Sequence, residues 1–227
     1  MRTKKALLVI GDGWHAPAPL QLTFSRFLRP LGYTVESIID YDIPFDTLNE
    51  YHMVIWSKYG RNDTLHMRDP DRYSADHQWI TPQQEQQLEA YVEQGGRLFF
   101  HHDGFTVYPK EGAITRLAGA YFITHPPIGP ITVTPVLPSS AFIKDITEFE
   151  IADEEYQLEM DTRKTNVLLE SYSEKNGRSV QGWYHRYGEG IVVVFIPGHT
   201  AEVLRHPMVN QCIRNVITVL DGDSLPK

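Results

Sequence analysis

Cysteine is almost absent from this sequence, which holds only Cys212 among its 227 residues. A single thiol cannot form an intramolecular disulfide, and it leaves no cysteine cluster for a structural zinc site. Cys212 falls on the apolar stripe of a predicted C-terminal helix, so we expect it to be a core residue.

Long hydrophobic runs are also missing. Spanning a bilayer takes about 18–20 consecutive apolar residues, and no run approaches that length. A secretory signal needs about 7–15 apolar residues and a small-residue cleavage site. The run after the basic N-terminus, Ala6–Ile10, is only five residues long. We therefore expect a cytoplasmic protein with no membrane partner.

Positive charge is scarce, because 21 Lys and Arg residues stand against 29 Asp and Glu residues. The formal net charge of −8 favours solubility. Such a surface opposes contact with a phosphate backbone, so nucleic acid is not an expected partner.

Several motifs of well-known enzymes are absent as well. No Gly-x-Gly-x-x-Gly follows the first expected strand, and no Gly-x4-Gly-Lys-Ser/Thr loop is present, so nucleotide cofactors have no fingerprint here. The sequence also lacks a Gly-x-Ser-x-Gly nucleophile turn and a His-Glu-x-x-His zinc helix. Any active site must be built from other residues.

What the chain does contain is the alternation of strands and helices typical of an α/β protein. Hydrophobic residues make up 41% and charged residues 22%, and the length fits one domain over residues 1–227. Because parallel strands need crossover connections, this order predicts a doubly wound, mainly parallel sheet with helices on both faces. The expected buried strands are Ala6–Ile10, Thr34–Ile39, His52–Trp56, Arg97–Phe100 and Ile191–Ile196.

Two segments depart from this alternation. Residues 121–187 carry mixed, partly alternating stretches with turn signals, which predict strands of an antiparallel extension or a side hairpin. Lys58–Trp79 holds many charges and no periodicity. A loop of that length is typical of a lid, a binding loop or a contact in a homo-oligomer, and a solvated surface excursion is the remaining alternative.

Histidine gathers in the turns that follow the expected strands. The ligand crevice of an open parallel sheet lies beyond the carboxyl ends of its strands. The turns after the first, fourth and last strands hold His15, His101-His102 and His199. Adjacent side chains of a strand point to opposite faces, so we predict that only His102 of that pair enters the crevice. This placement predicts a polar site, because histidine serves both proton transfer and metal binding.

Three segments together form a recognisable pattern. Gly95-Gly96 precedes an apolar strand that ends in His101-His102, and Asp153-Glu154-Glu155-Tyr156 forms an acidic turn. A tryptophan strand, a Tyr-Gly-x-Gly turn and another apolar strand then end in Gly198-His199-Thr200. Together these segments resemble the trehalose-utilisation (ThuA-like) family, and the likeness runs from the first strand to the last helix. The Gly-His-Thr block is its most specific part.

The resemblance implies a flavodoxin-like fold related to class I glutamine amidotransferases. In those enzymes the turn after the corresponding strand carries a nucleophilic cysteine, whereas this turn holds His101-His102 and Cys212 lies far along the chain. We therefore expect neither amidotransferase nor cysteine-hydrolase activity.

The family's association with disaccharide use implies a small-molecule carbohydrate as substrate. We expect acid–base chemistry on a keto-sugar or its glycoside by a lyase, isomerase or hydrolase, since a C–H proton beside a keto group is acidic. The expected base and acid are His102 and His199. The remaining expected site residues are Asp153 or Glu155 to orient a histidine, Tyr156 to bond a hydroxyl, Trp14 and Trp183 to stack on a sugar, and His15 to bind substrate.

Two further hypotheses remain open at this point. A family member without the nucleophile could be a non-catalytic sugar-binding or regulatory module. Alternatively, His15, His102 and His199, with a carboxylate near Asp153, could hold zinc, manganese or iron. No two of these histidines share the i, i+4 spacing of a zinc helix, so the ligands would have to converge from separate strand ends.

Overall fold

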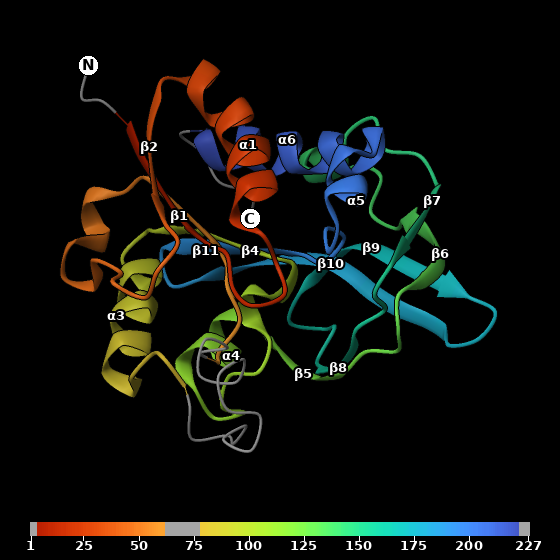
Figure 1. Ribbon diagram of the computed structural model, residues 1–227, viewed down its shortest axis with the longest axis horizontal. Coiled ribbons are helices and arrows are strands. Elements are labelled where there is room, and N and C mark those ends of the chain that lie inside the picture. The colour runs from red at the N-terminus through yellow and green to blue at the C-terminus, as the bar shows by residue number, and fades with distance from the viewer. Residues whose placement is uncertain (1–3, 62–77, 223–227) are drawn as a thin grey trace.

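The computed structural model describes residues 4–61 and 78–222 (Figure 1). Its centre is a nine-stranded sheet, of which five strands run parallel in the order β2-β1-β3-β4-β11. All five expected strands are confirmed to within two residues at each end. Their bounds are Lys4–Ile10 for β1, Tyr33–Ile38 for β2, Met53–Ser57 for β3, Arg97–His101 for β4 and Gly190–Phe195 for β11.

Helices cover both faces of this parallel part, so the doubly wound, flavodoxin-like class is confirmed (Figure 1). Alternate strand residues bury their side chains on opposite faces, as with Leu8 on one face and Leu7 on the other. The helices on the Leu8 face are α1 (Pro17–Leu28), α5 (Ala201–Arg205) and α6 (Pro207–Asp221); those on the Leu7 face are α3 (Pro82–Glu93) and α4 (Ala113–Ala118). Short 3-10 turns occupy Arg29–Leu31 (η1), Phe45–Glu50 (η2), His102–Phe105 (η4) and Ala141–Ile143 (η5).

The helix ends follow local sequence signals. Thr81 accepts from the Gln84 backbone N–H while the Gln84 side chain accepts from the Thr81 N–H, a complete capping box. Gly32 ends the first helical segment in the left-handed conformation, at φ 84°. In α6, Pro207 stands at the first position and Cys212 is buried, as expected.

An antiparallel extension continues the sheet beyond β11, as the texture of residues 121–187 predicts. Four strands follow in the order β10-β9-β6-β7, each antiparallel to its neighbour, so half of the pairings in this sheet are antiparallel. A separate two-stranded sheet joins β5 to β8. The bounds are Ala120–Thr124 for β5, Gly129–Pro135 for β6, Phe149–Asp153 for β7, Gln157–Met160 for β8, Asn166–Ser173 for β9 and Gly177–Tyr187 for β10.

This topology brings distant turns to one edge. The carboxyl ends of β1, β3, β4 and β11 face the same way, and β7 delivers the acidic turn. Residues 62–77, most of the charged segment Lys58–Trp79, lie outside the described residues. Within the described part of the chain, no helix is long and apolar enough to cross a membrane.

Candidate functional site

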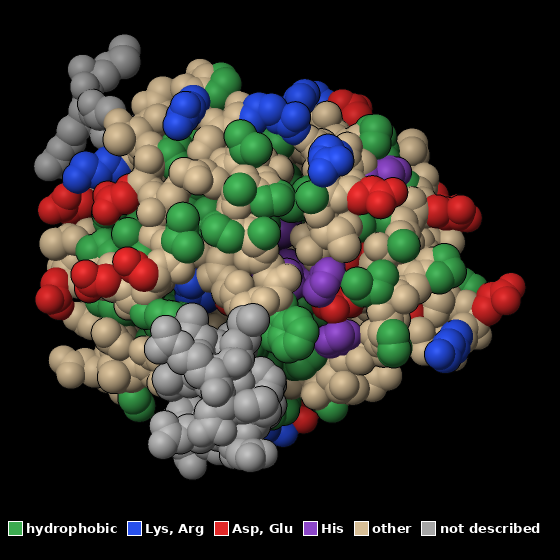
Figure 2. Space-filling view, in the orientation of Figure 1, with side chains coloured by type: hydrophobic (Ala, Val, Ile, Leu, Met, Phe, Trp, Pro, Cys, Tyr) green, Lys and Arg blue, Asp and Glu red, His purple; other side chains and the backbone are tan. Residues whose placement is uncertain are grey.

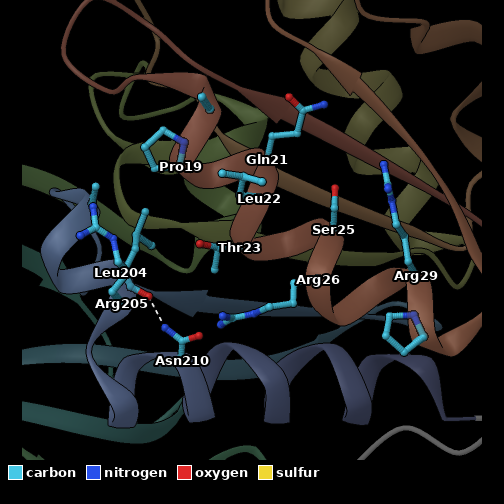
Figure 3. Close-up of a pocket in the computed structure, with 13 residues that line it drawn as sticks. Pro19, Gln21, Leu22, Thr23, Ser25, Arg26, Arg29, Leu204, Arg205 and Asn210 are labelled. Carbon is cyan, nitrogen blue, oxygen red and sulfur yellow. Dashed lines mark hydrogen bonds between the residues drawn. The ribbon is translucent and has the colours of Figure 1, made fainter.

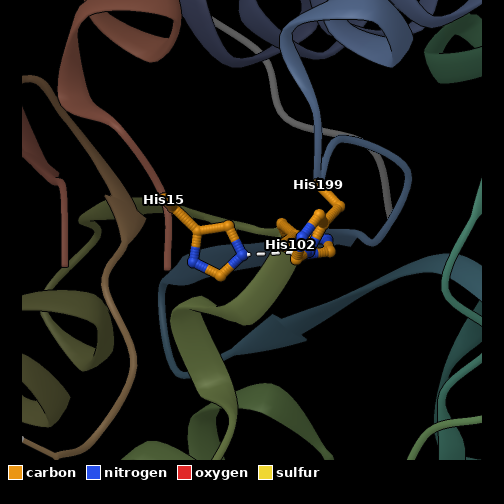
Figure 4. Close-up of side chains that lie close together, drawn as sticks. All are labelled: His15, His102 and His199. Atoms are coloured by element: carbon orange, nitrogen blue, oxygen red, sulfur yellow. Dashed lines mark hydrogen bonds between the residues drawn. The ribbon is translucent and has the colours of Figure 1, made fainter. Parts of the chain in front are cut away.

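Three histidines from three separate turns meet at the edge of the sheet (Figure 4). His15 follows β1, His102 follows β4 and His199 follows β11, and their ring nitrogens lie within 4.8 Å of one another. Nδ1 of His199 is 3.2 Å from Nε2 of His15 and 3.2 Å from Nε2 of His102. The histidine cluster expected from the sequence therefore forms. Histidine side chains reach the surface on the face shown in Figure 2.

Backbone geometry at His102 explains how this side chain enters the cluster. Strand β4 ends at His101, and His102 adopts φ 51°, which is uncommon for a residue with a Cβ. Such outliers gather at functional sites, where the surrounding structure holds them in place. His101 instead packs in the interior against Phe24 and Gly198, where a Cβ on the glycine would come within 2.5 Å of the His101 ring. The choice of His102 over His101 as the member of the cluster agrees with this arrangement.

Second partners fix the orientation of two of the rings. Nδ1 of His102 donates to the Ile196 carbonyl oxygen at 2.8 Å, which leaves Nε2 without a proton in the neutral ring. Nδ1 of His15 lies 2.9 Å from Oδ1 of Asp12 and 2.8 Å from Oδ2 of Asp103. A carboxylate on the remote nitrogen of a histidine is the usual support of a metal-binding imidazole.

The acidic turn supplies the carboxylate of the cluster through Glu154. Its Oε1 lies 3.2 Å from Nδ1 of His199, and its Oε2 lies 3.4 Å from Nε2 of His102. Oε1 also lies 3.4 Å from Nδ1 of His125, a ring that is partly exposed. Glu154 was not among the expected site residues, and neither were His125, Asp12 and Asp103.

The two carboxylates that were expected to orient a histidine have other partners. Asp153 accepts the Gly198 backbone N–H at 2.7 Å, so it anchors the loop of His199 rather than a ring. The Glu155 carboxylate accepts from Ser171, Ser173 and Asn176 and does not join the cluster. For Glu155 the expected role is wrong.

Of the expected aromatic residues, two lie at the site and one does not. The hydroxyl of Tyr156 is 3.3 Å from Nε2 of His102. Trp14 is 63% exposed beside His15, and its indole N–H donates to the Tyr59 hydroxyl at 3.2 Å. Trp183 is fully buried and donates to the Ala118 carbonyl oxygen, so the expectation that it stacks on a sugar is wrong.

A buried lysine supports the turn that carries Asp12 and His15. Lys58 is 1% exposed and follows β3, and its ammonium group donates to the carbonyl oxygens of Gly11 and Ile39. Gly11 needs its left-handed φ of 81° to make the turn. Lys58 thereby connects the ends of β1, β2 and β3 behind the cluster.

Burial and neighbouring charges shift the pKa values of the cluster in opposite directions. Burial, with the charge of His15 second, holds the pKa of His102 well below its usual value. Burial would also lower the pKa of His15, but Asp103 and Asp12 outweigh it and raise this pKa to about 11. Burial raises the pKa of Asp103 to about 7 and keeps the Tyr156 hydroxyl protonated by raising its pKa well above 10. Tyr156 is therefore a hydrogen-bond donor at neutral pH.

Comparisons with known proteins agree with this architecture. A family model described as trehalose utilisation, ThuA, matches residues 5–218. A protein of Parabacteroides merdae ATCC 43184 described as ThuA-like superposes with a TM-score of 0.75 at 12% identity, covering 100% of this chain and 92% of the other. A protein of Salmonella typhimurium LT2 described as cytoplasmic gives 0.68 at 15% identity, with 95% and 99% covered.

The fold also occurs inside a larger protein. A β-galactosidase from Rahnella sp. R3 superposes with a TM-score of 0.63 at 12% identity, over 92% of this chain but only 30% of its own. No curated protein matches the chain in sequence. At these identities the structural matches show the fold alone.

Proposed function

The chain belongs to the ThuA (trehalose utilisation) family, and from this premise we propose that it is a metal-dependent enzyme that processes a carbohydrate. The observation that carries the proposal is the convergence of His15, His102 and His199, with the Glu154 carboxylate beside His102 and His199. The family supplies the substrate class, and the cluster supplies the chemistry.

The separations between His199 and its neighbours in the cluster fit metal ligands. Ligand atoms bound tetrahedrally at the ~2.0–2.1 Å of a zinc–nitrogen bond lie ~3.3–3.4 Å from one another. Nδ1 of His199 lies 3.2 Å from Nε2 of His15, from Nε2 of His102 and from Oε1 of Glu154. The other Glu154 oxygen, Oε2, lies 3.4 Å from Nε2 of His102. Three ring nitrogens and a carboxylate suit zinc, manganese or iron.

Hydrogen bonding alone accounts poorly for the same contacts. A ring nitrogen offers either one proton or one lone pair, in the plane of the ring. Nδ1 of His199 has three polar neighbours at 3.2 Å, from His15, His102 and Glu154. One proton cannot serve all three, whereas one cation can accept a lone pair from each, once His15 releases the Nε2 proton that its raised pKa retains in the absence of a metal.

The side chains around the cluster fit a reaction on a keto-sugar. A bound cation would polarise the keto oxygen and stabilise the negative charge that develops there. Tyr156, whose hydroxyl lies 3.3 Å from Nε2 of His102, would donate to a substrate oxygen. If His102 and His199 are ligands, the proton beside the keto carbon would pass to another base. The partly exposed His125, which contacts Glu154, would be that base. Without a metal, His102 and His199 would be the base and acid themselves.

Exposed Trp14 supports a sugar as the ligand. Its indole stands at the rim of the cluster with 63% of its surface accessible, next to His15 and held by Tyr59. An aromatic ring with a polar anchor offers an apolar face to a sugar ring while its N–H stays satisfied.

Metal content tests the centre directly. We expect the undialysed protein to carry about one equivalent of zinc, manganese or iron, because a preformed ligand set binds tightly and its free energy adds to folding. Chelation should lower the melting temperature, since a ligand at about 100 times its Kd stabilises the folded state by about 2.7 kcal/mol. The measurement is elemental analysis with a thermal melt.

A pair of adjacent glutamates gives the matched control. Glu154→Gln should lose the metal, while Glu155→Gln should keep it, because Glu155 bonds to Ser171, Ser173 and Asn176 outside the cluster. Less than about 0.1 equivalent of any transition metal in the wild type would leave a metal-free acid–base site.

Turnover of keto-sugars tests the reaction. We expect the metal-loaded protein to consume 3-keto-trehalose or 3-keto-glucosides and to leave the parent sugars unchanged, because only the keto form has an acidified C–H bond. Mass spectrometry follows substrate and product. Tight binding of a sugar without turnover, by protein with full metal content, would instead support a non-catalytic sugar-binding module.

A further inference from the structure

A second concave surface, which none of the three clustered histidines lines, lies between α1 and the α5–α6 corner (Figure 3). Its volume is about 1060 Å³, and a neighbouring hollow of about 680 Å³ continues it along α6. The two share Arg26, Pro30, Arg205 and Asn210, so they form one groove, here called the arginine groove.

The charged residues that line the arginine groove are positive. They are Arg26, Arg29, Arg205 and Arg214, and no Asp or Glu of the part of the chain that the structure describes lines it. Among residues 4–61 and 78–222, none of these four arginines has a carboxylate within ion-pair distance. Figure 2 shows blue side chains over α1, α5 and α6 on the face where the histidines emerge. In a chain of net charge −8, this concentration of unpaired arginine runs against the overall electrostatics.

The walls between the arginines are apolar. Leu22 projects from α1 and is 73% exposed, and Pro19 and Leu204 line the same hollow. Near the far end, the guanidinium groups of Arg26 and Arg214 pack against the Phe27 ring at 4.7 and 5.3 Å from its centre. Asn210 offers an amide across from α1, although it already donates to the Leu204 carbonyl oxygen. The groove thus combines apolar walls with several guanidinium groups that form no ion pair with a described carboxylate.

We propose that the arginine groove binds a small organic anion, with phosphate or carboxylate groups on a compact apolar body. Guanidinium groups pair with either anion through two parallel N–H bonds. Each of the two hollows of the groove, at about 1060 and 680 Å³, has roughly the volume of a small-molecule pocket, about 300–1,000 Å³. A second copy of this chain fits it poorly, since a symmetric contact would set arginine against arginine. Binding of an anion in the groove does not depend on which reaction the histidine cluster performs.

Calorimetry with three probes tests the proposal: phenyl phosphate, phenylacetate and inorganic phosphate. We expect phenyl phosphate or phenylacetate to bind more tightly than inorganic phosphate, because the apolar body contacts Leu22 and Leu204. The comparison of the two aromatic probes identifies phosphate or carboxylate as the preferred group. The double variant Arg26→Gln/Arg205→Gln should weaken binding at least about tenfold, since each charged hydrogen bond contributes strongly.

Two controls separate the groove from other sources of binding. Arg163→Gln/Arg178→Gln removes the same charge at exposed arginines that lie near Asp161 and Glu170, and it should leave the affinity within about twofold. Chelated protein should bind the probes as well as metal-loaded protein does. The proposal is overturned if no probe binds at millimolar concentration, if both double variants weaken binding equally, or if chelation alone abolishes it. Binding of an acidic peptide without any small anion would also overturn it.

Discussion

His199→Asn is expected to abolish most activity and metal binding while leaving the melting temperature of the metal-free protein nearly unchanged. The His199 side chain is 21% exposed at the rim, and its contacts are the other members of the cluster, His15, His102 and Glu154. Removing a partner of a metal ligand costs about 10–100-fold in affinity, so removing a ligand should cost at least about 100-fold. Elemental analysis and a melt of chelated protein measure the two effects.

His206→Asn provides the matched control for this substitution. His206 lies seven residues further along the same segment, accepts the Met208 backbone N–H at the start of α6 and stacks on Phe149. Asparagine caps helices well, so this variant should keep both metal and activity. If His199 were only a packed structural residue, His199→Asn would cost about 1–3 kcal/mol and lower the melting temperature by several degrees. Intact activity per folded molecule would then refute its role in the cluster.

The strands and helices of the parallel part could be predicted from clear local patterns, namely apolar runs and helix-capping residues. Strand β11 is buried on both faces, so its run of apolar residues is continuous and unmistakable. In α3 the capping box and the proline at the first helical position mark the start of the helix without reference to any other element. The histidine cluster was also predictable, because the carboxyl ends of parallel strands meet at one edge whatever the rest of the chain does.

The carboxylate of the cluster was not predictable in the same way. Along β7 the side chains alternate between buried and exposed up to Asp153, and the strand ends there. Which of the next two glutamates turns toward the histidines depends on the path of an irregular turn, which has no period. Asp153 fixes that path by bonding the Gly198 N–H from the neighbouring loop. A long-range contact of this kind leaves no trace in the local sequence.

The positions of Trp183 and His125 were not predictable for a related reason. Trp183 lies on β10, inside the nine-stranded sheet, and its indole N–H reaches back to the end of α4. His125 follows β5, whose pairing with β8 sets it beside Glu154. Both placements depend on how the antiparallel extension folds against the parallel part. The sequence predicted that extension without its pairing.

The turn after His102 approaches the neighbouring strand very closely at Gly104. A Cβ built on Gly104 would lie 2.0 Å from the carbonyl oxygen of Trp56 and 2.8 Å from its carbonyl carbon. Trp56 is in β3, which is hydrogen-bonded on both sides to β1 and β4, and its fully buried indole donates to the Tyr108 hydroxyl at 3.1 Å. Because the obstacle is backbone in the middle of a sheet, it cannot give way as a flexible side chain would.

Gly104→Ala is therefore expected to destabilise the protein by more than about 3 kcal/mol, above the usual cost of overpacking a core. The clash displaces η4 and with it His102 and Asp103, so folded protein that remains should also bind less metal. Urea unfolding measures the first effect and elemental analysis the second.

Gly129→Ala is the matched control, because the nearest neighbour of its new Cβ would be the Pro127 oxygen at 3.8 Å, an ordinary contact. That variant should change stability by at most about 1 kcal/mol. An equal free energy of unfolding for the two variants would mean that the turn carrying His102 does not lie against β3.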